Sequence, residues 1–485
     1  MEVKVLSKET IIPSSPTPPH LQTFQLSLLD QLSPMLYIPL LLFYPMKRSY
    51  DHIDQHDQDP KKTIATLKTS LSKTLSRFYL LAGRIIDKSI HCNDKGAVFM
   101  EATINTNMFD ILKEPNNEVL TKLLPCSLLC NTKPIEEYPQ IVVQANVFKC
   151  GGIAISLCLL HKLIDAATFC CFLRSWATTN RELLSQLDHS SPNNMVCFDY
   201  KSFSSLFPQT NLLPFHQRLI NNDNAVILPS SIFNGKRRLQ RFVFRSKAIL
   251  DLKAKAKSCD IPNPTCVEAI TCFIWKYLMK VADGGDSQMP STLSHVVNIR
   301  KMIEPSLGEV SLGNIMWGTV AHHFSTTRPN ESFEGLELSK LVSLLRQSLK
   351  KINKDYIKEL IMGGDKGRRN GVMKLVGEIN KWPISNYYFF TSWKNMKLNE
   401  LDFGWGKPLW FGIAGDSNEM MGNIIVLVDN VSDDGSIEAW ILLDEKEMQL
   451  LEQNPQFLEF ALLNPSIHLP HDHKIADQIF SRKLI

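Results

Sequence analysis

The segment HKLID places a histidine and an aspartate, His161 and Asp165, where an apolar run ends and a helix-like pattern begins. A histidine at the end of a strand can act as a general base, because its pKa lies near neutrality. A positioned base and a resting place for the oxyanion are enough to move an acyl group from a thioester to a hydroxyl. From these five residues alone, however, a structural histidine beside a helix cap is the more common interpretation.

A second unusual segment, DFGWGKP, occupies residues 402–408. In it Gly404 and Gly406 alternate with aromatic residues that include Trp405, and a proline follows. Because glycines accept backbone angles that other residues avoid, this pattern predicts a rigid turn with buried rings. On its own, the segment is interpreted as structural.

The elements that must position HKLID follow from hydrophobic periodicity. Residues 139–160 predict a β-hairpin that turns at Gly151 and Gly152. The residues after His161 predict an amphipathic helix with Asp165 as its N-cap. The histidine is thus expected at a junction between a strand and a helix.

Helices and strands are mixed along the rest of the chain. An apolar stripe predicts a helix over 61–77, and residues 35–45 predict a buried strand. Thr265 and Glu268 have the spacing of a capping box and predict the start of another helix. GGDKGRR, at 363–369, lacks the spacing of a phosphate-binding loop and is interpreted as a surface loop.

The length of 485 residues exceeds what one hydrophobic core usually supports, so two domains are expected. We predict a first domain over 1–187 and a second over 237–464. Between them lies a connecting segment, 188–236, rich in Ser, Asn and Pro, and residues 465–485 form a tail. Part of about 380–398 is expected to pack with the first domain.

The composition excludes several classes of protein. A formal net charge of +4 on so long a chain gives no support for nucleic-acid binding. The eleven cysteines form no regular framework and no signal peptide is recognised, which predicts reduced thiols in the cytoplasm. No apolar run is long enough and free of charges, so no membrane span is predicted. The histidines of HLPHDH lie in the tail without a cysteine partner, so no metal site is predicted.

Taken together, H-x-x-x-D in the middle and D-F-G-W-G near the end resemble the motif pair of the BAHD acyltransferases of plant specialised metabolism. Further segments resemble the family in the family's order and cover nearly the whole chain: LSLLDQ, IPLLLFYP, FYLLAGRI, VFKCGG, PTCVEAITCFIWK, NIR at 298–300, GN at 313–314, FTSW and GSIEAW. The N-terminal sequence is most similar to that of family members that acetylate alkaloid hydroxyls.

The resemblance implies an α/β fold of two similar-sized chloramphenicol-acetyltransferase-like domains. Each would have a mixed sheet with flanking helices, and a solvent channel would run between them. It implies a monomeric, coenzyme A-dependent O-acyltransferase that binds no cofactor permanently. Its substrates would be an acyl-CoA and a small-molecule alcohol, which enter from opposite faces.

By position, the resemblance assigns the role of general base to His161. It implies that Asp165 turns away from the substrate and pairs with Arg300, which holds the histidine loop in shape. Asp402, Gly404, Trp405 and Gly406 would be structural and remote from the chemistry.

Four more residues match family positions near the substrates. Thr391 and Trp393 correspond to residues that line the acyl or acceptor pocket. Lys253 and Lys255 fall where relatives place basic residues near the coenzyme A phosphates, although a solvated helix face explains KAKAK equally well.

The acyl donor is predicted to be small and uncharged. Relatives that use malonyl donors often carry an aromatic pair before the GN dipeptide, whereas Ser311 and Leu312 stand here. This favours acetyl-CoA. The alternatives are an aromatic acyl donor (benzoyl or hydroxycinnamoyl), an amine acceptor, and a non-catalytic member that acts as a partner protein. A non-catalytic member would be expected to lose one of the two motifs, and both are intact.

Overall fold

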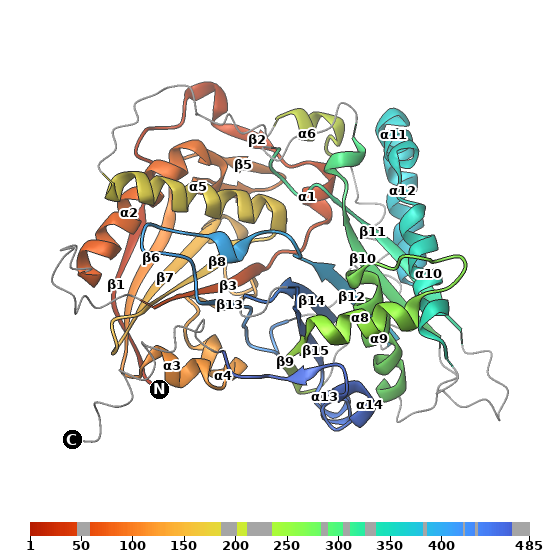
Figure 1. Cartoon of the computed structure of the whole chain (residues 1–485). Helices are drawn as coiled ribbons and strands as arrows, with labels where there is room; N and C mark the ends of the chain where they lie inside the picture. Colours follow the sequence, from red (N-terminus) through yellow and green to blue (C-terminus); the bar gives the residue numbers. More distant parts are fainter. Residues whose placement is uncertain are drawn as a thin grey trace, which may run out of the picture.

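The computed structural model describes residues 1–45, 59–185, 201–210, 235–282, 290–303, 311–324, 336–381, 386–420, 422–431 and 435–467. Its strands form two large sheets and one small sheet, and Figure 1 shows helices packed beside each large sheet. Of the predicted connecting segment, the structure describes mainly helix α6 (Lys201–Leu206). The tail histidines lie outside the described residues.

The first sheet is mixed and has the strand order β1-β6-β7-β8-β3-β13. The β6–β7 pair is parallel, and the other neighbours are antiparallel. The predicted hairpin is confirmed: β7 and β8 pair around Gly151, whose φ is 87°. The strands are β1 (Val3–Ile11), β3 (Tyr37–Tyr44), β6 (Ala97–Ile104), β7 (Ile141–Phe148), β8 (Ile153–Leu160) and β13 (Trp410–Gly412).

Two long helices, α2 (Pro60–Arg77) and α5 (Ala166–Leu184), lie side by side over this sheet (Figure 1). Both were predicted from their periodicity, and their apolar stripes share one core with the strands. The buried indole of Trp176 on α5 donates to Ser70 Oγ of α2 at 2.9 Å. Since α5 begins five residues after His161, this packing fixes the position of the histidine loop.

The second sheet has the order β11-β10-β12-β14-β15-β9-β16 and is also mixed. Strand β12 runs parallel to both of its neighbours, β10 and β14. The carboxyl ends of β10 and β12 therefore lie at the same edge of the sheet. Arg300 lies two residues after the end of β10, and Trp393 directly follows β12. The strands are β9 (Arg237–Phe244), β10 (Ser291–Asn298), β11 (Met316–His323), β12 (Tyr387–Ser392), β14 (Asn423–Asp429), β15 (Ile437–Asp444) and β16 (Leu462–Leu463).

Helices on the second sheet bury a separate hydrophobic core. The predicted capping box is confirmed at the start of α9, where Glu268 N–H donates to Thr265 Oγ1 and Thr265 N–H donates to Glu268. The helices are α8 (Ser246–Ala256), α9 (Cys266–Val281), α10 (Leu338–Lys350), α11 (Lys354–Met362), α12 (Gly364–Ile379), α13 (Glu445–Glu452) and α14 (Pro455–Leu458).

The interpretation of residues 363–369 as a loop is wrong, because they open helix α12. The reason lies in the packing of α12 against α11. A Cβ atom on Gly371 would lie 2.2 Å from a terminal carbon of Leu360, so glycine is what permits the close approach of the two helices.

The chain crosses from the second sheet back to the first. Strand β12, within the stretch 380–398 that was expected to pack with the first domain, lies inside the second sheet. The turn toward the first domain begins at Trp393, whose ring contacts Phe169 of α5, and β13 then pairs with β3. The crossing segment thus links both sheets beside α5.

Smaller elements complete the first domain. Strands β2 (Thr23–Gln25), β4 (Arg84–Ile86) and β5 (Ser89–His91) form the small sheet. Helices α1 (Leu28–Leu32), α3 (Met108–Leu112) and α4 (Asn117–Thr121) are single turns or little more. Within the described residues, none of the helices has the length and apolar character needed to cross a membrane.

Candidate active site

His161 directly follows the fully buried strand β8. Its backbone N–H donates to Leu36 O at 2.8 Å, which fixes the point where the chain leaves the sheet. The apolar strand must stop here because Lys162 and Asp165 introduce charge, and Asp165 then caps α5 by accepting from Thr168 N–H at 2.8 Å. The strand–helix junction predicted for HKLID is present, and the His161 residue is only partly buried.

Asp165 and Arg300 form a buried, two-pronged ion pair between the domains. The guanidinium Nη1 lies 2.7 Å from Asp165 Oδ2, and Nη2 lies 3.1 Å from Oδ1. Burial by itself would raise the pKa of Asp165, but the charge of Arg300 and the hydrogen bonds from Arg300 and Thr168 outweigh it and hold the pKa below its usual range. The carboxylate therefore stays ionised.

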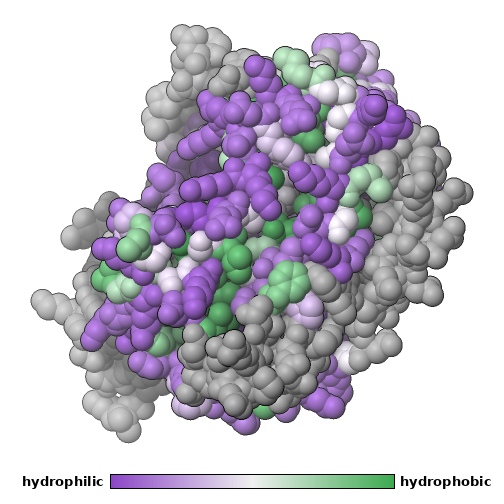
Figure 2. All heavy atoms as spheres, turned by 90° about the vertical axis from the view of Figure 1, so that its right-hand side faces the viewer, coloured by the Kyte–Doolittle hydropathy of each residue, from purple (hydrophilic) through white to green (hydrophobic). Residues whose placement is uncertain are grey.

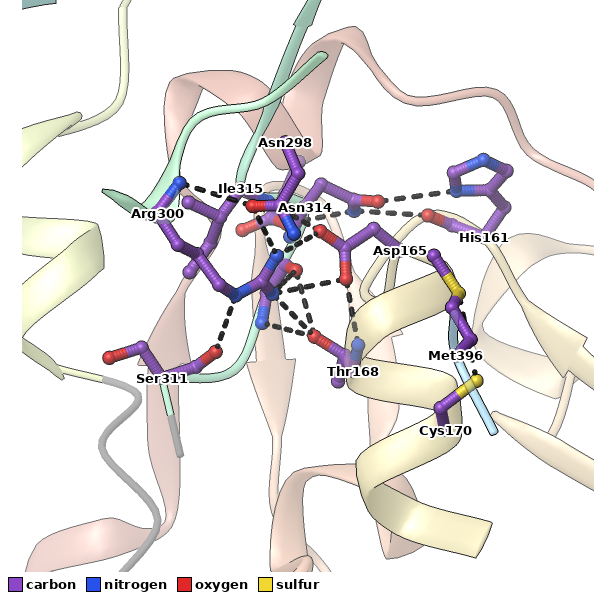
Figure 3. Close-up of polar contacts among 12 residues, drawn as sticks. His161, Asp165, Thr168, Cys170, Asn298, Arg300, Ser311, Asn314, Ile315 and Met396 are labelled. Carbon is purple, nitrogen blue, oxygen red and sulfur yellow. Dashed lines mark hydrogen bonds and ion pairs between the residues drawn. The ribbon is translucent and has the colours of Figure 1, made fainter. Parts of the chain in front are cut away.

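The Arg300 guanidinium also organises the loop that precedes β11. It donates to the backbone oxygens of Ser311 and Gly313, at 3.2 Å each. Thr168 Oγ1 accepts from Gly313 N–H at 3.1 Å, so the start of α5 and this loop are held together. Figure 3 shows the Asp165 carboxylate directed into this cluster rather than toward the imidazole.

The imidazole contacts Asn314, a residue for which the sequence analysis gave no role. Nδ1 of His161 lies 3.2 Å from Asn314 Oδ1, and Asn314 Nδ2 donates to His161 O at 3.0 Å (Figure 3). Burial lowers the pKa of His161, partly offset by its hydrogen bonds and the Asp165 charge. The ring is therefore neutral at neutral pH, with Nε2 directed away from Asn314. The GN dipeptide was the sequence signal that could have pointed to Asn314.

Thr391 and Trp393 lie at the carboxyl end of β12, the edge that meets the first domain. Trp393 N–H donates to Leu427 O at 2.7 Å, and its buried ring meets Phe169 edge-on with centroids 6.5 Å apart. Thr391 is partly buried and pairs with Val426 in the sheet. The structure thus brings Trp393 against the helix that begins beside His161.

The DFGWG turn is held by its own aspartate. Asp402 Oδ1 accepts from the N–H groups of Gly404 and Gly406 at 2.7 and 3.0 Å. Both glycines have φ values above 100°, which other residues avoid. The Trp405 ring stacks on Phe403, with centroids 5.7 Å apart.

This turn packs near the far end of α5. Arg181 donates to Asp402 O at 3.0 Å, and Asn180 donates to Phe403 O. At 1.5 Å per residue, Arg181 lies about 20 Å along the helix from the N-terminus beside His161. The motif therefore supports α5 and does not reach the imidazole.

Lys253 and Lys255 lie on α8, on the second sheet's helical layer (Figure 1). Lys255 is exposed, with its ammonium 5.6 Å from the centre of the Phe460 ring, and Lys253 is partly buried. The structure does not bring them into the cluster around His161. Across the described residues, no group of three or more His, Cys, Asp or Glu side chains is placed to hold a metal ion.

Comparison with known proteins shows which family this chain belongs to. A family model described as "Transferase family" matches residues 1–458. Limonoid 7-O-acetyltransferase of Citrus sinensis is 35% identical, over 96% of this chain and 99% of its own. Salutaridinol 7-O-acetyltransferase of Papaver somniferum is 32% identical, over 93% and 96%.

The fold is similar to a solved structure as well. The crystal structure of vinorine synthase matches with a TM-score of 0.74 and 28% identity, covering 96% of this chain and all of that one. The predicted architecture of two domains with mixed sheets and flanking helices is thereby confirmed. The chain belongs to the Transferase family of BAHD enzymes and is an acyl-CoA-dependent acyltransferase.

Proposed function

We propose that this enzyme transfers an acetyl group from acetyl-CoA to a hydroxyl of a plant alkaloid. The names of salutaridinol 7-O-acetyltransferase and limonoid 7-O-acetyltransferase support an O-acetyl transfer to a plant alcohol. Ser311 and Leu312, where malonyl-using relatives often carry an aromatic pair, support a small uncharged acyl group. The proposal of an alkaloid acceptor rests on the N-terminal sequence, which resembles that of family members that acetylate alkaloids, and on the similarity to salutaridinol 7-O-acetyltransferase.

His161 serves as the general base in this proposal. Its ring takes the proton of the acceptor hydroxyl while the hydroxyl oxygen attacks the thioester carbonyl carbon. The tetrahedral oxyanion collapses, the carbon–sulfur bond breaks, and the proton passes from the imidazolium to the thiolate of coenzyme A. The observation that carries this role is the imidazole between the two domains, whose Nδ1 lies 3.2 Å from Asn314 Oδ1 and whose pKa is lowered by burial.

The other site residues have supporting roles. Asp165 and Arg300 hold the histidine loop against the loop before β11 and do not take part in proton transfer. Thr391 and Trp393 line the acyl or acceptor pocket, and a donor from this region stabilises the oxyanion. Lys253 and Lys255 attract the phosphates of coenzyme A at the mouth of its entry path.

We also propose that the enzyme is a cytoplasmic monomer with no permanently bound cofactor. None of the cysteines in the described part of the chain forms a disulfide, which is typical of a reducing compartment. On the face shown in Figure 2, hydrophilic residues predominate among the coloured residues, and apolar residues gather near its middle.

The test is a product screen by mass spectrometry with purified enzyme. Acetyl-, malonyl-, benzoyl- and hydroxycinnamoyl-CoA are each combined with panels of alkaloid alcohols, limonoid alcohols and amines. We expect acetylated alkaloid products that the His161→Ala variant does not form. A benzoyl, hydroxycinnamoyl or amide product would instead favour the alternatives, and no thioester turnover with any acceptor would favour a non-catalytic partner protein.

A further inference from the structure

The side-chain amide of Asn314 is held in one orientation by its neighbours. Its Nδ2 lies 2.9 Å from Asp30 Oδ1 and 3.0 Å from His161 O, and its Oδ1 lies 3.2 Å from His161 Nδ1. The carboxylate oxygen and the backbone oxygen accept hydrogen bonds, so the amide nitrogen must face them. The reversed amide would set its oxygen against two other oxygens. The amide oxygen therefore faces the imidazole.

This orientation favours one protonated nitrogen of the His161 ring, which also interacts with the backbone of His161 and Ile164. An amide oxygen can only accept, so the neutral ring must donate through Nδ1–H. The lone pair then lies on Nε2, the nitrogen that would receive the proton of the acceptor. The opposite tautomer would carry a proton on Nε2 and could not act as a base there.

The carboxylate of Asp30 divides its two oxygens between two tasks. Oδ2 accepts from the N–H and Oγ–H of Ser27, at 3.0 and 2.7 Å, and this completes the capping box of α1. Oδ1 accepts from the backbone N–H and Nδ2–H of Asn314, at 3.1 and 2.9 Å. Capping requires only the first oxygen. The second is used for Asn314, and the carboxylate is fully buried.

We propose that Asp30 is a positioning residue for the reaction: through Asn314 it fixes His161 as the Nδ1–H tautomer and keeps Nε2 available as the base. The inference rests on the proposed role of His161. Without Oδ1 of Asp30, the Asn314 amide loses one of the two acceptors that set its direction, and only His161 O still holds its nitrogen. It can then turn its NH₂ group to Nδ1 and select the inactive tautomer.

The first test reads the tautomer directly in the unmodified enzyme. The protein is labelled with ¹⁵N-histidine, and two-bond ¹⁵N–¹H correlation spectra are recorded at neutral pH. The His161 signals are those that disappear in the His161→Gln variant. We expect the pattern of a neutral ring protonated at Nδ1, and a ring protonated at Nε2 would overturn the proposal. Because no turnover is measured, this result is separate from the test of His161 as the base.

The second test separates positioning from helix capping. Asp30→Ala removes both tasks of the carboxylate, whereas Ser27→Ala weakens the same cap and leaves Oδ1 and Asn314 in place. We expect Asp30→Ala to lower kcat about 10- to 100-fold with a nearly unchanged KM for acyl-CoA. Ser27→Ala should retain most of its kcat. Equal losses of kcat in the two variants would contradict the proposal.

An exchanged pair provides a rescue that a purely structural role does not predict. Asp30→Asn combined with Asn314→Asp keeps one amide and one carboxylate and again places an acceptor opposite Nδ1. We expect a higher kcat than in Asp30→Ala. The new carboxylate beside the ring should also raise the imidazole pKa and move the acidic limb of the kcat/KM profile to higher pH. No gain in kcat and an unmoved limb would count against the proposal.

Discussion

The ion pair between Asp165 and Arg300 makes a quantitative prediction about stability. Arg300→Met removes the guanidinium but leaves the Asp165 carboxylate buried, with Thr168 and the backbone N–H of Ile315 as its remaining donors. Removing one partner of a buried ion pair destabilises a protein by about 3–5 kcal/mol. We expect the upper part of this range, because the hydrogen bonds from Arg300 to the loop before β11 are lost as well.

The loss should depend on pH in a direction that the pair dictates. In the wild type the pKa of Asp165 lies below its usual value, so its stabilisation is present at neutral pH and is lost only as pH falls through that low pKa. In Arg300→Met the burial remains without the compensating charge, so the pKa of Asp165 should rise. The difference in unfolding free energy should therefore be largest near pH 7 and shrink toward pH 4.

Urea unfolding followed by tryptophan fluorescence at both pH values measures this difference. Arg300→Lys is the matched control, because it keeps the charge but not the two-pronged geometry, and we expect it to lose about 1–2 kcal/mol. The double variant Asp165→Asn with Arg300→Met should recover part of the loss, since no buried charge is left unpaired. An unfolding free energy of Arg300→Met within about 1 kcal/mol of wild type at pH 7 would refute the reasoning.

Three further predictions concern the turn, the base and the coenzyme. Gly404→Ala should lower the unfolding free energy by about 1–3 kcal/mol with little change in kcat. The reason is that φ of this residue is 109° and the new Cβ would lie 2.6 Å from a terminal carbon of Leu184. Thermal melts and initial rates measure the two effects. The value of kcat/KM should fall on the acidic side only below about pH 6.5, because burial lowers the pKa of His161 and the base works when deprotonated. An acidic limb above that pH would contradict the role of His161 as the general base. Replacing Lys253 and Lys255 by alanine should raise the KM for acyl-CoA about fivefold at low salt and leave kcat unchanged, whereas a solvated helix face predicts no change in either.

Local sequence patterns predicted the elements that flank the site. The two β-rich runs on either side of Gly151 and Gly152 predicted the β7–β8 hairpin, and Asp165 was recognisable as an N-cap before an amphipathic stretch. Both signals depend on residues that are close together in the chain, so periodicity and capping chemistry suffice to detect them. The pairing of Asp165 with Arg300 came from the family resemblance and not from local pattern.

Other features depend on contacts that a single sequence does not reveal. Helix α12 was missed because the glycines in its first turns and at Gly371 lower helix propensity, while its packing on Leu360 makes a glycine favourable. Strand β1 was not predicted because its outer residues are exposed, and its pairing with β6 spans about ninety residues of chain. In both α12 and β1, tertiary contacts rather than the local sequence determine the secondary structure.

The GN dipeptide marked Asn314 as a family position, but the role of this residue could not be predicted from the sequence for a related reason. It is an uncharged residue in a loop, and no local pattern distinguishes an asparagine that orients a histidine from one that caps a turn. Only the fold brings it between Asp30 and His161, residues that are separated by more than a hundred positions.

The most direct test of the account compares wild type and His161→Gln in single-turnover acyl transfer, with both proteins shown to have the same circular dichroism and thermal stability. Glutamine keeps a polar side chain at this position but cannot serve as the base. The account predicts that the rate of the chemical step falls by about 10²–10⁴ while acyl-CoA still binds. A rate for His161→Gln close to that of wild type would contradict it.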